Sequence, residues 1–226
     1  MPTINGKVCV VNGVPVDKVF SNGKQVYGRN LLLDSQTRIL DTSWFSKNLV
    51  WTKDWGTYLG SNIKRTSYSW NNDRYRYKDL LDRGVINTTD DFTYSVYFRV
   101  VGEDPAGMSY ADIKLISAST SENGYVPLQL TSLKEGQWAR IVVPIKFIDV
   151  EYDQAYDYDY AIRLEMTAAT KVAGAYYEFA APKLEKGSIA TPYSIAPEDV
   201  LNGYIAAPRN LTATVINVGT EKLDWE

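Results

Sequence analysis

The sequence predicts an all-β sandwich or jelly roll, and three observations lead to this fold class. Several segments alternate apolar and polar residues with the period of two that a half-buried strand requires. Helical periodicity is weak along the whole chain, and the best case is a short turn in "YKDLLDRG" that Gly84 closes. The strands are short, regularly spaced and joined by polar loops, which is typical of sandwiches and jelly rolls.

Residues 1–28 form the first unit of the chain. They contain short β-branched runs separated by Asn12-Gly13 and Asn22-Gly23. Asn-Gly between such runs is a strong hairpin signal, because both residues accept the positive φ angles of a tight turn. The segment is too small to hold a core alone. We therefore expect a small N-terminal β-hairpin leader that docks on a neighbour or on another chain.

Residues 29–195 form the predicted main domain. In "FTYSVYFRV" one face carries only large apolar residues, and in "YDYDYAIRLEM" the same alternation recurs. "ARIVVPIKF" and "AYYEFA" are two further predicted strands, and Pro144 places the first of them at a sheet edge or at a bulge, because proline cannot donate to a ladder. The apolar face of the first segment consists of Phe92, Tyr94, Val96, Phe98 and Val100.

Residues 196–226 differ in composition from the main domain. "SIAPEDVLNGYIAAP" is a linker rich in small residues and proline, and "PRNLTATVINVGTEKLDWE" follows it. This last stretch resembles the opening strands of a fibronectin type III domain, with Pro208 and Leu211 in the first strand and Leu223 and Trp225 in the second. Such a domain has about 100 residues. We therefore expect that the chain is part of a longer protein.

The composition excludes several classes of function. The chain has 226 residues, a formal net charge of −3 and no histidine, and Cys9 is its only cysteine. The usual general base, the common catalytic triads and the commonest transition-metal ligand are therefore missing. The negative net charge argues against nucleic acid as a partner. Since no apolar run approaches the roughly 20 residues of a membrane-spanning helix, we expect no membrane insertion.

Four stretches carry a resemblance to a known family. They are "NGKQVYGRNLLLDS", "INTTDDFTYSVYFRV", "LKEGQWARIVVPI" and "YYEFAAPKLEKGSIATPYSIAPED". Together, over residues 22–200, they resemble the carbohydrate-binding-module-like, galactose-binding-type jelly rolls of tail and baseplate proteins from phages that infect Gram-positive bacteria. The resemblance implies a virion protein made in the host cytoplasm. It also implies that Trp138 is a scaffold residue and that the closing motif ends the module, without specifying a sugar.

Residues 44–77 are the best candidate for a saccharide site, because they combine dense aromatic content with polar turns. Sugar rings stack their C–H faces on aromatic planes, while polar side chains at the margin bond the hydroxyls. The stacking candidates are Trp51, Trp55, Tyr58 and Trp70, and the hydroxyl partners are Asn71, Asp73, Arg74 and Tyr75. The opposing interpretation is that most of these rings are core. A second place for the site is a rim of Tyr110, Tyr125, Tyr152 and Tyr156.

Metal and catalytic sites have weaker signals. Jelly rolls of the resembled type often hold a structural calcium between their first and last strands, which makes Asp34 and Glu178 weak candidates, although neither lies in a ligand motif. The acidic run "EYDQAYDYDY" lacks the glycine and closing glutamate of a helix-loop-helix calcium site. No carboxylate pair has a distinctive motif around it. We expect no enzymatic activity and no cofactor apart from such a calcium.

These observations predict noncatalytic binding of host cell-wall polysaccharide during phage adsorption, with other tail or baseplate proteins, and further copies of the chain, as partners in the virion. Two alternatives remain open. One is a structural spacer or assembly domain of the tail that binds no sugar. The other is an accessory carbohydrate-binding module of a bacterial surface enzyme or adhesin. An exposed aromatic cleft favours binding, whereas an exposed face of small and charged residues favours the spacer.

Overall fold

A computed structural model gives the fold. It describes residues 8–11, 14–36, 55–67, 71–105, 112–113, 126–127, 133–147, 161–166, 169–201 and 216–217. The strands are β1 (Cys9–Val11), β2 (Val14–Pro15), β3 (Lys18–Ser21), β4 (Lys24–Gly28), β5 (Thr57–Tyr58), β6 (Ser61–Asn62), β7 (Lys64–Thr66), β8 (Asn71–Arg76), β9 (Phe92–Val101), β10 (Asp112–Ile113), β11 (Val126–Pro127), β12 (Ala139–Ile145), β13 (Ala161–Met166), β14 (Tyr176–Lys186) and β15 (Ile216–Asn217). The helices are α1 (Lys78–Asp82) and α2 (Pro197–Leu201).

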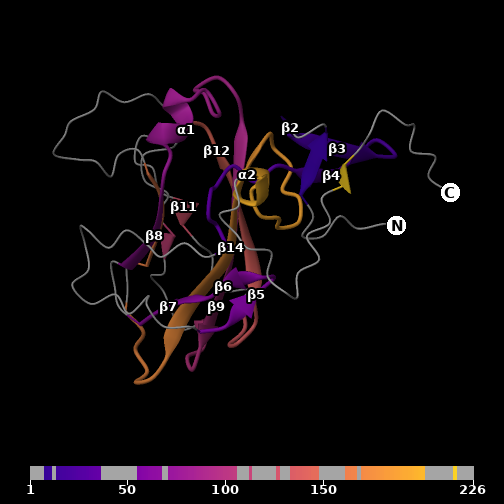
Figure 1. Ribbon diagram of the computed structural model, residues 1–226. Coiled ribbons are helices and arrows are strands. Elements are labelled where there is room, and N and C mark those ends of the chain that lie inside the picture. Colours follow the sequence, from indigo (N-terminus) through magenta and orange to yellow (C-terminus); the bar gives the residue numbers. More distant parts are fainter. Residues whose placement is uncertain are drawn as a thin grey trace.

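A four-stranded antiparallel sheet forms the centre of the domain, with the strand order β12-β9-β14-β7 (Figure 1). Its strands lie far apart in the sequence, as in jelly rolls. Strand β9 alternates as predicted, since the residues of its apolar face are all buried and face the first core. Strand β12 lies at the edge of the sheet, which is one of the two positions, edge or bulge, that Pro144 predicts.

The first face of this sheet packs against a second layer. That layer contains the antiparallel pair β8–β13, with Ile162 on β13 fully buried, and helix α1 at the predicted "YKDLLDRG" turn. Large aromatic residues fill the space between the layers: Tyr77, Phe92, Tyr94, Phe98, Phe147, Tyr177 and Phe179. Two packed β-layers around one apolar core confirm the predicted all-β sandwich.

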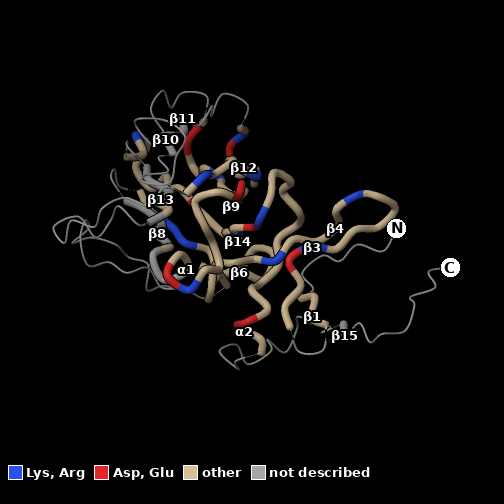
Figure 2. The backbone as a smooth tube through the Cα atoms, turned by 90° about the horizontal axis from the view of Figure 1, so that it is seen from above, with Lys and Arg blue, Asp and Glu red and all other residues tan. Residues whose placement is uncertain are grey.

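The second face of the sheet carries a different core. It contains Val8, which precedes β1, Val10 from β1, Ile63, Ala180 and Ala181 from β14, and Tyr193 and Ile195 from the closing segment. The leader thus docks on the main domain at β1. Its second hairpin, β3–β4, turns through Asn22 and Gly23 at φ angles of 50° and 73°, as the sequence predicts. This hairpin extends away from the sandwich (Figure 2).

A β-bulge in β14 sets which residues face each core. The register with β9 shifts between Ala180 and Lys183, and Ala181 has a positive φ of 53°. As a result, Tyr177 before the bulge and Leu184 after it both reach the first core, although an odd number of positions separates them. Without the extra residue, the charged residues after the bulge would face the apolar core.

The bulge also brings a charged pair, Lys183 and Glu185, into a fully buried position on the second face, with 3.6 Å between Nζ and Oε2. The Thr191 backbone N–H and hydroxyl donate to Glu185 at 2.9 and 2.6 Å. The same hydroxyl oxygen accepts bonds from Lys183 Nζ at 2.7 Å and from the Gly28 N–H at 2.9 Å. Burial lowers the pKa of Lys183 to about 8, an effect that Glu185 opposes. We call Gly28, Lys183, Glu185 and Thr191 the terminal clasp.

Residues next to the clasp tie the entry of the domain to its exit. The buried Asn30 side chain donates to the carbonyls of Pro182 and Ser194 at 3.2 and 2.9 Å. Arg29 pairs with Glu198, and Asp34 donates its backbone N–H to Asp199 at 2.8 Å. Both ends of the resembled module thus meet in one buried polar network. A Cβ on Gly28 would lie 1.9 Å from Glu185 Oε2, so only glycine fits there.

Strand β15, near the C-terminus, pairs in parallel with β1 of the leader. The positions Pro208, Leu211, Leu223 and Trp225, on which the fibronectin-like resemblance rests, lie outside the described residues. The domain boundaries at residues 28 and 195 stay predictions. Among the described helices, none is long and apolar enough to cross a membrane.

Candidate functional site

The structure describes the side chains of only two of the predicted saccharide-binding residues. Trp55 and Tyr58 lie on the second face of the central sheet, where they pack against the second core. Asn71, Asp73, Arg74 and Tyr75 belong to β8, whose backbone pairs with β13 in the layer over the first face, and their side chains are not described. Trp51, Trp70 and the alternative rim of Tyr110, Tyr125, Tyr152 and Tyr156 lie outside the described residues. The predicted set stays a prediction.

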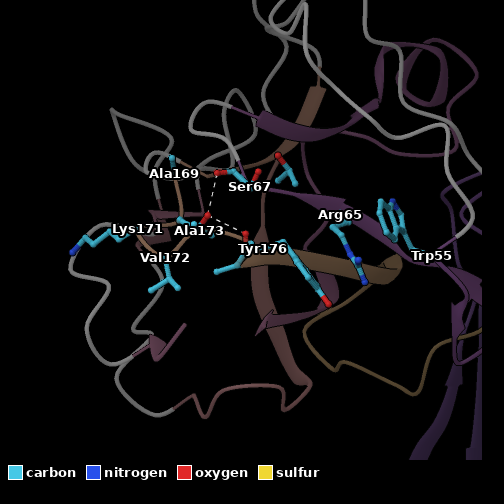
Figure 3. Close-up of a pocket in the computed structure, with 12 residues that line it drawn as sticks. Trp55, Arg65, Ser67, Ala169, Lys171, Val172, Ala173 and Tyr176 are labelled. Atoms are coloured by element: carbon cyan, nitrogen blue, oxygen red, sulfur yellow. Dashed lines mark hydrogen bonds between the residues drawn. The ribbon is translucent and has the colours of Figure 1, made fainter. Parts of the chain in front are cut away.

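A pocket of about 760 Å³ lies at the β7 edge of the sheet, close to Trp55 (Figure 3). Strand β7 and Ser67 form one wall, and the segment before β14 forms the other. The volume is within the range of about 300–1,000 Å³ that is usual for small-ligand sites. The lining residues are Trp55, Arg65, Thr66, Ser67, Ala169, Thr170, Lys171, Val172, Ala173, Gly174, Ala175 and Tyr176.

An aromatic and cationic stack forms one end of this pocket. The Arg65 guanidinium carbon lies 3.8 Å from the centroid of the Trp55 ring and 3.6 Å from that of the Tyr176 ring. Cation–π attraction is strong at these distances and holds all three planes in place (Figure 3). Tyr176 reaches the stack because it is the first residue of β14, whose next positions pair with β7.

The Arg65 side chain is fixed from behind by a buried carboxylate. Glu178 is fully buried, and its Oε1 accepts bonds from Arg65 Nε at 2.9 Å and Nη2 at 2.5 Å. Its Oε2 accepts a bond from Arg99 Nε at 2.5 Å. Both oxygens of this weak calcium candidate therefore bind arginine, which already compensates the buried charge. Within the described residues there is no cluster of three or more acidic or cysteine side chains that could hold a metal.

The loop opposite the stack is held in a defined shape. Thr170 donates its backbone N–H to the Ser67 carbonyl at 3.1 Å and its hydroxyl to the Ala175 carbonyl at 3.0 Å. Glu103 accepts bonds from the backbone N–H groups of Lys171 and Val172 at 2.7 and 3.2 Å. Since loop ordering costs binding free energy, a preformed loop favours affinity.

Tyr58 is part of a second aromatic group. Its ring stacks on Trp138 with centroids 4.3 Å apart and meets the edge of Tyr97 at 5.2 Å. The Arg99 guanidinium carbon lies 4.6 Å from the centroid of the Trp138 ring. Burial raises the pKa of the Tyr58 hydroxyl. The packing of Trp138 agrees with the scaffold role that the resemblance implies.

Two key residues of the pocket, Arg65 and Tyr176, were not among the residues predicted from the sequence. Arg65 lies within the predicted stretch 44–77 but is not aromatic, and Tyr176 lies in "YYEFA", which was predicted only as a strand. They come together because β7 pairs with β14, with Arg65 opposite Glu178. No local signal in the sequence reports this pairing over more than a hundred residues.

No protein-family model and no curated protein matches this chain. Three solved structures are similar to it. The CBM22-1 xylan-binding domain of Xyn10C from Paenibacillus barcinonensis has 15% identity and a TM-score of 0.36, over 61% of this chain and 80% of that one. The tripod (BppUct-A-L) from the baseplate of bacteriophage Tuc2009 has 16% identity and a TM-score of 0.35, over 61% of this chain and 50% of that one.

The CBM22-1-CBM22-2 tandem domain of Xyn10C, also from Paenibacillus barcinonensis, has 15% identity and a TM-score of 0.36, over 62% of this chain and 39% of that one. This chain therefore spans half or less of the baseplate chain and of the tandem domain.

Proposed function

We propose that the chain is a noncatalytic saccharide-binding module of a phage tail or baseplate protein, which attaches the virion to host cell-wall polysaccharide. One observation carries this proposal: the pocket between Trp55, Arg65 and Tyr176 combines aromatic planes with polar groups. Aromatic rings support the C–H faces of a sugar. The hydroxyl-bearing residues Ser67 and Thr170, which also line the pocket, offer partners at the margin for sugar hydroxyls.

The proposed sugar position is beside Trp55, which was predicted from the sequence, and beside Arg65 and Tyr176, which were not. A single pocket of this kind gives weak affinity. Several copies of the chain in one tail tip, assembled with other tail proteins, would raise the overall affinity by avidity, because each further contact is intramolecular. This arrangement suits adsorption, since a virion samples the wall by weak contacts before many sites engage at once.

The spacer alternative also has an observation in its favour. Tyr58, Tyr97 and Trp138 pack on one another and, partly buried, on the second core. A sheet face that is occupied in this way can belong to a tail domain whose only role is to join its neighbours. The two functions differ in whether the pocket at Tyr176 binds sugar.

The test uses Tyr176→Ala, with Phe20→Ala as the matched control on the exposed β3–β4 hairpin. Binding is measured to wall polysaccharide and to whole Gram-positive cells, and thermal melting is measured in parallel. We expect Tyr176→Ala to lose about 1–3 kcal/mol of binding free energy, as aromatic hot spots do, and to stay folded. Phe20→Ala should bind as the parent does. Equal binding by both variants would show that the sugar binds away from this pocket, and no binding by the parent would support the spacer.

A further inference from the structure

The pocket has a charge that differs from that of the whole chain. The chain has a net charge of −3, yet among the described residues that line the pocket none is acidic, and two of them, Arg65 and Lys171, are basic. Two acidic side chains lie behind the pocket walls, and both accept hydrogen bonds there. Glu178 accepts bonds from Arg65 and Arg99, and Glu103 accepts bonds from two backbone N–H groups of the loop. The surface that faces a ligand is therefore cationic.

Arg65 and Arg99 both pair with Glu178, which leaves an excess of positive charge at the Arg65 end of the pocket. Glu178 carries one negative charge and binds two arginines, so these three residues together have a net charge of +1. Arg65 uses Nε and Nη2 for Glu178, and within the part of the chain that the structure describes its Nη1 makes no hydrogen bond. The Arg65 side chain is 21% exposed, which leaves this donor group reachable from the pocket.

We propose that the pocket binds a saccharide unit that carries an oxyanion, either a uronate carboxylate or a sugar phosphate, with Arg65 as the specificity-determining residue. This inference rests on the proposed function and adds the substrate class. Guanidinium donors form short, strong bonds to carboxylate and phosphate oxygens. The rings of Trp55 and Tyr176 hold the guanidinium in one orientation, so little side-chain entropy is lost when the anion binds.

The test exploits Ala173, which lines the pocket and is exposed (Figure 3). Ala173→Glu places a carboxylate at the pocket, and Ala173→Gln is a control of the same size without the charge. Neither substitution removes a side-chain contact of the wild-type protein beyond a methyl group. The probes are wall polysaccharides from a panel of Gram-positive bacteria, each in three forms: untreated, carboxyl-reduced and dephosphorylated.

We expect the chain to bind at least one untreated polysaccharide and to lose at least about tenfold in affinity for the form from which the oxyanion is removed. Carboxyl reduction identifies a uronate, and dephosphorylation identifies a phosphate. Ala173→Glu should bind the untreated form about five to ten times more weakly than Ala173→Gln, which corresponds to about 1–1.4 kcal/mol. The difference should shrink at high salt, because screening weakens charge repulsion.

A second pair of variants tests the arginine itself. Arg65→Gln should lose the preference for the charged form, whereas Lys24→Gln, which removes the same charge from the exposed β3–β4 hairpin, should keep it. Equal binding of charged and neutralised polysaccharide, with equal binding by the two Ala173 variants, would overturn the anion inference and leave the proposed function standing. Binding to no form of any polysaccharide would overturn both.

Discussion

Thr191→Val is the sharpest perturbation of the terminal clasp. Valine has nearly the shape of threonine, so the change removes the hydroxyl and leaves the packing intact. The hydroxyl makes three buried hydrogen bonds, as a donor to Glu185 and as an acceptor from Lys183 and the Gly28 N–H. Each of these groups loses a partner in a region where water does not replace it, because Lys183 and Glu185 have no exposed surface.

The magnitude follows from the nature of the three bonds. A hydrogen bond to a charged group contributes about 1.5–3 kcal/mol and a neutral one about 0.5–1.5 kcal/mol. Lys183 keeps its bond to the Pro192 carbonyl at 2.8 Å, and Glu185 keeps the Thr191 N–H, which reduces the loss. We therefore expect Thr191→Val to lower the free energy of unfolding by about 3–5 kcal/mol.

Urea unfolding followed by tryptophan fluorescence measures this change, with Thr191→Ser as the control. Serine keeps the hydroxyl, so it should lose only the contribution of one methyl group, about 1 kcal/mol. A loss below about 1 kcal/mol for Thr191→Val would show that the clasp does not stabilise the domain. Equal losses for valine and serine would show that packing, and not hydrogen bonding, is what matters at this position.

Three further predictions follow from the structure. Phe98→Ala should lower the free energy of unfolding by about 3–5 kcal/mol, because the ring is fully buried. Phe20→Ala on the exposed hairpin should change it by less than about 0.5 kcal/mol. Similar effects of the two substitutions on the free energy of unfolding would refute the burial pattern. Burial raises the pKa of Asp199 to about 6. The folded state thus holds this proton more tightly than the unfolded state, and stability should fall as the pH rises from about 4 to 6; Asp199→Asn should reduce this dependence in thermal melts. Incubation with host cell walls should release no reducing sugar above a buffer control, and steady release that one acidic substitution abolishes would contradict the absence of catalysis.

Local patterns in the sequence predicted several of the strands and, for β9, the side chains that it buries. The alternation in β9 predicted its core face, because successive residues of any strand point to opposite sides of a sheet. Asn22-Gly23 predicted a hairpin, because few other residue pairs accept the backbone angles of its turn. Pro144 predicted an edge position or a bulge, because it lacks an N–H, and the strand lies at the edge. Each of these inferences needs only one residue and its near neighbours.

The candidate site needed more than local patterns. Trp55 was predicted because it lies in an aromatic, polar stretch, but its partners Arg65 and Tyr176 were not. They become neighbours only when β7 pairs with β14. Strand pairing over such a separation depends on the total free energy of many long-range contacts, and no short segment encodes it.

The closing motif shows the same division. Its sequence alone determined the turn at Gly187, which has a φ of 101°, and predicted that the chain leaves a β-domain there. Only the tertiary structure decided that Lys183 and Glu185 are buried, because the bulge at Ala181 turns them to the second face and the segment around Thr191 then covers them. Charged residues at alternate positions normally indicate a solvated strand face. Here their mutual pairing and the hydroxyl of Thr191 offset the cost of removing them from water.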